Sequence, residues 1–248
     1  MIAPVLAGVI ERRVLVNYAV DPDVAARLLP SPFRPQIVKD RAVAGICLIR
    51  LAQLRPKGLP AWVGIASENA AHRIAVEWDT DDGTRSGVYI PRRDSGSALN
   101  VAVGGRLFPG EHHRASFETS QTASTMRVRY SSRDGSVGVD VDVQLTDRLE
   151  GSVLFADTED ASAFFRAGSD GFSSRADAGL DGLSLRTDSW RVEAATPLAV
   201  RSSFFEDRTT FPAGSARLDS VLVMRQVPVS WHATEAPTRL TNSTERES

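Results

Sequence analysis

Two adjacent histidines, His112 and His113, follow a Pro-Gly turn in the segment GGRLFPGEHHRASFE, residues 104–118. A neutral imidazole that faces a cavity can exchange protons near neutral pH, so either histidine is a candidate general acid or base. If the segment is extended, the two side chains point to opposite faces. Both then cannot readily bind one metal ion, and we predict no metal site unless His72 or distant carboxylates converge there. A histidine that only hydrogen-bonds at a strand end is the structural alternative.

Glu68 is the candidate carboxylate for acid–base chemistry with these histidines. It directly precedes a predicted strand and lies near Asn69 and Arg73 in the sequence. Charged groups are rarely buried without partners. If Glu68 points inward, Arg73 or Arg106 can hold it ionised, and we count both arginines among the candidate substrate-binding residues. If Glu68 points outward, it is a solvated turn residue.

The segment IPRRDSG, which contains Arg92 and Arg93, is typical of a loop at the mouth of a barrel. A guanidinium there can hold a substrate carboxylate through two hydrogen bonds, which makes Arg92 a candidate substrate-binding residue. Paired arginines are also common surface charge, and that alternative stays open. Tyr89 is a further candidate substrate contact. As a group, the larger aromatic residues fit a β core better than a ligand cage; they are Trp62, Trp78, Tyr89 and Trp190.

The sequence excludes several other chemistries. It contains no Walker A loop, no G-x-G-x-x-G, no G-x-S-x-G and no H-E-x-x-H motif. Its single cysteine, Cys47, lies in the apolar run AVAGICLI, so we expect a buried thiol rather than a disulfide or a thiolate zinc cluster. These absences predict a protein without a cofactor.

Charge and hydropathy restrict the partners and the compartment. The net charge of −2 at pH 7 gives no electrostatic case for binding nucleic acid or an anionic membrane. No apolar run approaches the ~20 residues that a membrane span needs. The N-terminus lacks the basic region that opens a signal peptide. We therefore expect a cytoplasmic protein that binds neither nucleic acid nor membrane.

Short strands joined by tight turns must position these side chains. In RRVLVNYAVDPDVAARLLPSPF, Val14, Val16 and Tyr18 alternate as in a strand, and Asp21 is placed to cap a short helix. A second capped helix is predicted in DTEDASAFFRAG, ending at Gly168. The valines of SVGVDVDVQL predict a buried strand face opposite a solvated face of aspartates, and turns such as DDG and RDG indicate antiparallel hairpins.

These elements predict a mainly β protein with a few short helices. We expect one closed or partly closed antiparallel β-barrel over residues 1–231, followed by a polar, disordered tail over residues 232–248. No internal repeat or linker separates the barrel into two domains.

Two stretches resemble the acetoacetate decarboxylase superfamily. VLVNYAVDPDVAARLLPSPF is similar to its N-terminal strand and helix, and ALNVAVGGRLFPGEHHRA is similar to its segment that runs to the catalytic lysine pair. The resemblance covers roughly residues 10–231, and the chain is more similar still to an uncharacterised bacterial group with this fold. It implies a barrel with a pocket. Glu68 then matches the acid that the family keeps in this pocket, and Arg106 matches the arginine of the family's Gly-Arg dipeptide.

The resemblance also implies a missing amine. Enzymes of this family form a Schiff base between a ketone and a lysine, and only an amine can form an imine. Here the matching positions are Glu111, His112 and His113, and the two lysines of the chain, Lys39 and Lys57, lie in other elements. The family's decarboxylation is therefore not expected of this protein.

Three hypotheses follow for the function. The first is a lyase- or hydrolase-type enzyme that acts on a keto acid or other carbonyl compound, with His112 or His113 and Glu68 as acid and base. The second is a protein that binds such a ligand without catalysis. The third is a structural protein whose barrel is filled by side chains, which a cavity would contradict. The resemblance also allows a homo-oligomer, because relatives of this fold commonly assemble.

Overall fold

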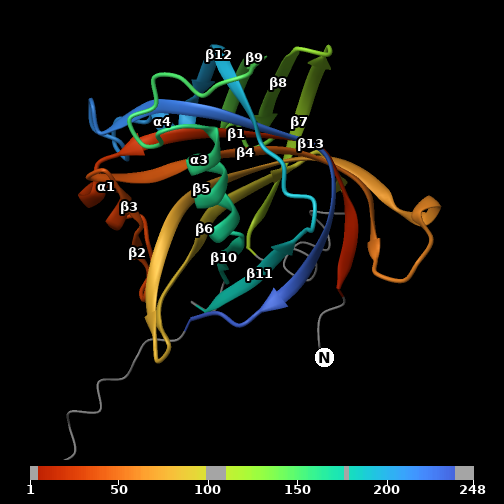
Figure 1. Ribbon diagram of the computed structural model, residues 1–248, viewed down its shortest axis with the longest axis horizontal. Coiled ribbons are helices and arrows are strands. Elements are labelled where there is room, and N and C mark those ends of the chain that lie inside the picture. Colours follow the sequence, from red (N-terminus) through yellow and green to blue (C-terminus); the bar gives the residue numbers. More distant parts are fainter. Residues whose placement is uncertain (1–4, 99–109, 176–178, 238–248) are drawn as a thin grey trace, which may run out of the picture.

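The computed structural model describes residues 5–98, 110–175 and 179–237, and most of them lie in strands (Figure 1). The strands are β1 (Leu6–Val20), β2 (Arg34–Pro35), β3 (Ile37–Val38), β4 (Arg41–Pro56), β5 (Ile65–Thr80), β6 (Gly83–Ser95), β7 (His112–Gln121), β8 (Thr125–Ser132), β9 (Gly138–Thr146), β10 (Asp170–Ser174), β11 (Leu180–Arg186), β12 (Glu193–Ser202) and β13 (Ala216–Thr234). The helices are α1 (Pro22–Ala26), η1 (Ala61–Val63), α3 (Thr158–Ala167) and α4 (Ser203–Glu206).

The strands form a sheet that closes on itself twice. Pairing of β5 with β6 closes a nine-strand ring in the order β5, β6, β7, β8, β9, β12, β13, β1 and β4. Pairing of β11 with β13 closes a seven-strand ring through β10 and β6. The two rings share β13, β1, β4, β5 and β6, which we call the shared wall. Figure 1 shows β7, β8, β9 and β12 at one end of the molecule and β10 and β11 at the other, with the long strands between them.

This architecture confirms the predicted mainly β, partly closed barrel, with one difference. The pairing is antiparallel except where β6 meets β7 and β10, which it pairs in parallel. The shared wall explains why AVAGICLI is apolar throughout. Its side chains alternate between two faces, and each face is buried inside a different ring. Ile46 and Leu48 contribute to the core of the nine-strand ring, whereas Val43 and Cys47 face the seven-strand ring.

The core of the nine-strand ring is filled by side chains. The valines of β9 point into it as their alternation predicts, and Asp140 on the outer face pairs with Arg127 and Arg129. Helix α4 contributes Phe205, whose ring stacks on that of Tyr18 with centroids 4.0 Å apart. Packing of this kind gives the nine-strand ring a large hydrophobic core.

Both predicted helix caps are confirmed. The Asp21 carboxylate accepts a hydrogen bond from the backbone N–H of Asp23 at 3.0 Å, and Pro22 opens α1. Asp157 caps α3 by accepting from the N–H of Asp160 at 2.9 Å, and the helix ends at Gly168. Helix α3 packs its buried face against the shared wall on the side of the seven-strand ring. The capping residues in the sequence therefore correctly predicted α3, the helix that covers the site described below.

The structure differs from the predictions for one core residue and for the end of one strand. Trp62 is 84% exposed, because it lies in η1 on the loop between β4 and β5, and not in the core. Strand β13 continues to Thr234, three residues past the predicted end of the barrel at residue 231, because Gly182 of β11 pairs with Thr234. Residues 238–248 of that tail lie outside the described part of the chain. Within the described ranges, no helix has the length and apolar character needed to cross a membrane.

Candidate functional site

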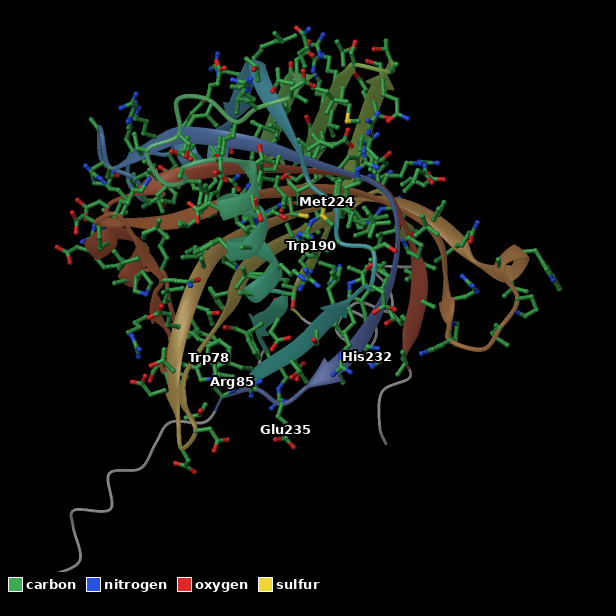
Figure 2. The ribbon with its side chains drawn as sticks, in the orientation of Figure 1. Trp78, Arg85, Trp190, Met224, His232 and Glu235 are labelled. Atoms are coloured by element: carbon green, nitrogen blue, oxygen red, sulfur yellow. The ribbon has the colours of Figure 1, made fainter. Side chains whose placement is uncertain are left out.

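A cavity of about 140 Å³ lies in the seven-strand ring, between the shared wall, the C-terminal end of α3 and strands β10 and β11. Much of its lining is apolar, and the side chains that carry chemistry are Arg13, Cys47, Arg73, Arg93, His112 and Trp190. Figure 2 shows Trp190 near Met224 at the centre of the molecule, where the two pack in one cluster. The cavity contradicts the hypothesis of a structural barrel that is filled throughout.

A polar row across four strands positions Arg73. Ser220 of β13 pairs with Asn17 of β1, Asn17 with Gly45 of β4, and Gly45 with Arg73 of β5. The Asn17 amide donates to Ser220 Oγ at 3.1 Å, and its oxygen accepts a hydrogen bond from Arg73 Nη2. Gly45 makes room for the guanidinium. A Cβ at Gly45 would lie 2.2 Å from the Val16 carbonyl oxygen and 3.3 Å from Arg73 Nη2.

Arg73 is a buried cation that is only partly satisfied. Its exposed fraction is 3%, and the remaining guanidinium nitrogens, Nε and Nη1, have no hydrogen-bond partner among the described residues. The guanidinium lies over the ring of Phe165 from α3, 4.5 Å from its centroid. Burial lowers the pKa of Arg73 to about 9, so it still carries its charge at neutral pH. Arg73 therefore places in the cavity wall a positive charge with two nitrogens that lack partners in the described part of the chain and are each less than 1 Å² exposed.

Two further arginines line the same cavity. Arg13 of β1 donates its two recorded side-chain hydrogen bonds to sulfur, from Nε to Cys47 Sγ at 3.1 Å and from Nη1 to Met224 Sδ at 3.7 Å. Arg93 keeps some accessible surface because it faces the cavity, but the surrounding protein desolvates it and lowers its pKa to about 10. The cavity is therefore lined by guanidinium groups from three strands of the shared wall.

Cys47 faces this group of arginines. It is 7% exposed, which confirms the predicted buried thiol, and it lines the cavity. Sequence analysis noted its burial and missed its position in the site. Arg13 was not among the predicted site residues, whereas Arg93 was named with Arg92 as a possible carboxylate ligand and does line the cavity. A signal for Arg13 was available, because a charged residue in phase with Leu15 and Asn17 in an otherwise apolar strand must point toward a polar partner or an open space.

The two adjacent histidines separate as the strand geometry predicts. His112 and His113 open β7, and their side chains point to opposite faces. His112 lines the cavity. His113 lies near Asp134, with 3.1 Å between its Nδ1 and a carboxylate oxygen. Among the described residues, no group of three or more histidine, cysteine or acidic side chains could hold a metal ion.

Glu68 lies on the other face of the shared wall. Residues 68, 70 and 72 of β5 share one face, and residues 69, 71 and 73 share the other. The Glu68 carboxylate pairs with Arg12 at 2.5 Å and with Arg50 at 3.3 Å. The structure therefore brings His112 and Arg73 together at the cavity but holds Glu68 apart from them.

The other predicted substrate contacts are distributed over different places. Arg92 lies within strand β6 and not in a loop as predicted, and it binds both oxygens of Asp94 at 2.8 and 2.9 Å. That fully buried carboxylate lies on the nine-strand side of the wall, where Tyr130 also donates to it. Tyr89 packs in the cluster with Trp78, and its hydroxyl lies 2.9 Å from Ser174 Oγ. Arg106 lies outside the described residues.

The lysines lie away from the site. Lys39 follows β3 and Lys57 follows β4, and both are exposed. Among the residues described as lining the cavity there is no lysine.

The doubly closed sheet with its cavity has an acetoacetate decarboxylase-like fold. Acetoacetate decarboxylase from Legionella pneumophila superposes with a TM-score of 0.64 at 11% identity, covering 96% of this chain and 89% of that one. An acetoacetate decarboxylase-like enzyme from Sphingomonas wittichii gives 0.59 at 11% identity, covering 94% and 93%. The enduracididine biosynthesis enzyme MppR, in complex with pyruvate, gives 0.57 at 13% identity, covering 94% and 88%.

A family assignment comes from the sequence itself. Residues 10–228 match the family DUF2071, described as "Uncharacterized conserved protein (COG2071)", and the chain belongs to this family. No curated protein matches the sequence. At identities of 11–13%, the structural similarity shows the fold alone. The chemistry must be inferred from the residues of the site.

Proposed function

We propose that this protein binds a small carboxylic acid of the keto acid class in the cavity of the seven-strand ring. The observation that carries the proposal is Arg73, a buried cation with two guanidinium nitrogens that lack a partner within the described structure. A buried charge is costly unless an opposite charge or hydrogen bonds compensate it. A carboxylate would accept from two guanidinium nitrogens at once, which is the geometry that arginine favours.

The rest of the lining supports an acid of this size. Arg13 and Arg93 add positive charge to the cavity, and the carboxylate of Asp94, an acid among the lining residues, is directed to Arg92 and Tyr130 on the other face of the wall. The apolar part of the wall suits a short carbon chain, and a cavity of about 140 Å³ can hold a small organic molecule. The relative MppR, whose complex contains pyruvate, has the same fold.

His112 is the acid–base group that we propose for catalysis. It lines the cavity beside the arginines, whereas Glu68 lies on the opposite face of the wall. Hydration, enolisation or hydrolysis of a bound carbonyl compound needs a proton donor and acceptor but no imine. Because neither lysine lines the cavity in the described structure, borohydride reduction in the presence of a ketone ligand should leave no adduct on Lys39 or Lys57. A binding protein without catalysis is the second candidate, and Arg73 supports it equally.

Calorimetric titration tests the binding site. Pyruvate and acetoacetate should bind the wild-type protein, and Arg73→Met should weaken binding by about tenfold or more, since the bidentate pair is lost. The matched control is Arg129→Met, because Arg129 lies on the outer face of β8 and pairs there with Asp140. Acetone, which lacks the carboxylate, should not distinguish the variants. Equal affinity of the wild-type and Arg73→Met proteins for the acids would contradict the proposal.

Adjacent histidines allow a matched test of catalysis. We expect His112→Gln to abolish turnover in a panel of keto acids and lactones while it retains ligand binding. His113→Gln should retain turnover, because His113 points away from the cavity. If neither substitution changes turnover, His112 is not the acid–base group. If no member of the panel is turned over but the acids still bind, the non-catalytic candidate stands.

A further inference from the structure

Building on the binding function proposed above, we infer that Cys47 is a nucleophile. It adds to an electrophilic carbon next to the carboxylate group of a ligand that is bound at Arg73. Cys47 is the only cysteine of the chain and lies in the middle of β4, with its side chain on the face of the shared wall that forms the cavity. It is thus both buried from bulk water and open to any molecule that occupies the cavity.

Arginine side chains surround the cavity that the Cys47 sulfur faces. Arg13 Nε donates to Sγ at 3.1 Å, and Arg73 and Arg93 line the same cavity. Cationic donors of this kind are the environment in which a thiolate, the nucleophilic form of cysteine, is stabilised. A thiol that only filled space in an apolar wall would need none of them.

The spacing along β4 places the sulfur beside the proposed carboxylate site. Gly45 pairs with Arg73, and Cys47 is the next residue on the same face of β4, about 6.6 Å further along the strand. A carboxylate held by Arg73 over Gly45 therefore directs the carbon next to it toward Cys47. The ligand class that this arrangement selects is a carboxylate with an electrophilic carbon at the adjacent position, such as a 2-oxo acid.

With a 2-oxo acid the step is an addition that needs no other reactant. The Sγ electron pair forms a carbon–sulfur bond to the carbonyl carbon, and the π electrons of the carbonyl move to its oxygen. The thiol proton passes to His112, which lines the same cavity, and then to the carbonyl oxygen. The product is a hemithioketal, and the reverse steps release the acid unchanged.

Alkylation tests the inference, and intact-mass spectrometry assigns the product because the chain has a single cysteine. Iodoacetate carries a carboxylate and iodoacetamide does not, and in both the sulfur displaces iodide. An unassisted thiol reacts more slowly with iodoacetate than with iodoacetamide. We expect native Cys47 to show the reverse order, because Arg73 binds the anionic reagent. In Arg73→Met the ratio of the two rates should fall by about tenfold, and in Arg129→Met it should not change. Pyruvate should protect Cys47 from both reagents.

Four outcomes are decisive. If native Cys47 reacts with neither reagent, or if the ratio is the same in Arg73→Met as in the wild type, the inference is wrong. Unfolded protein serves as the control for the first outcome, since its cysteine must be labelled. If pyruvate binds in an Arg73-dependent manner while native Cys47 stays inert, the binding function stands and only the inference fails. If Arg73→Met leaves both pyruvate affinity and the alkylation ratio unchanged, both proposals fail.

Discussion

The two faces of the shared wall are built from the same strands but are filled differently. On the face inside the nine-strand ring, aromatic and aliphatic side chains from β8, β9 and α4 meet those of the wall and form a hydrophobic core. On the face inside the seven-strand ring, α3 and β10–β11 cover the wall only in part, and a cavity of about 140 Å³ remains between them. The facing layer, and not the wall, decides which face holds a site.

Two buried arginines, one on each face of the wall, differ in how their charges are compensated. Arg12 and Arg73 are each 3% exposed and lie on opposite faces of the wall. Arg12 on the filled side pairs with Glu68 at 2.5 Å. Arg73 on the cavity side has Asn17 as its hydrogen-bond partner and no acid within the described structure. A buried charge without its counter-ion is costly and marks a place where a ligand can supply one.

The largest expected contrast concerns packing. Leu48 and Leu51 lie on the same strand, β4, with exposed fractions of 0% and 4%, but only Leu51 lines the cavity. Leu48→Ala should lower the free energy of unfolding by about 4 kcal/mol and Leu51→Ala by about 2 kcal/mol, because Leu51 already lacks neighbours on its cavity side. Urea titration of both variants measures the difference. Equal losses would mean that the two faces are equally well packed.

The second contrast compares the free energies of unfolding of two variants, in which Arg12 or Arg73 is replaced by methionine, a side chain of similar length. Arg12→Met should lower the free energy of unfolding by about 2 kcal/mol, because Glu68 loses its closest partner and keeps Arg50. Arg73→Met should leave the free energy of unfolding unchanged or raise it by about 1 kcal/mol, because it removes an uncompensated charge. The same variant loses carboxylate binding, so stability and function would separate. A destabilisation of Arg73→Met as large as that of Arg12→Met would show that Arg73 is structural.

The smallest effect lies on the filled side and depends on pH. His72 is fully buried against Phe204, and burial lowers its pKa to about 3, with a contribution from Arg92. The unfolded chain binds a proton at His72 below about pH 6.5, whereas the folded protein does not until far lower pH. Folding stability should therefore fall as the pH drops through this window.

Comparison with a variant isolates this contribution of His72. Between pH 6.5 and 5.5 the wild-type protein should lose about 1 kcal/mol more of its free energy of unfolding than His72→Leu does, which urea titrations at the two pH values can measure. Identical pH dependence of the two proteins would mean that His72 becomes protonated within the folded structure.

Sequence reasoning reached those features that depend on local geometry. The alternation of β9, the caps of α1 and α3 and the separation of His112 from His113 follow from the repeat of a strand or the first turn of a helix. The chain order of Glu68 and Arg73 was visible too. Because Glu68 and Arg73 are five residues apart in one strand, they lie on opposite faces, and the sequence analysis counted them as a possible pair.

The sequence by itself determined which residues alternate, where the helices begin and that only two lysines exist. The tertiary structure decided which face of each strand is covered, and it thereby brought Arg13, Cys47 and Arg73 from three strands to one cavity. The physical reason is that side-chain direction follows from neighbours in the chain, whereas the layer that faces a strand is set by pairings between residues far apart in sequence. Two strands with the same apolar pattern can therefore bound a filled core on one side and a binding site on the other.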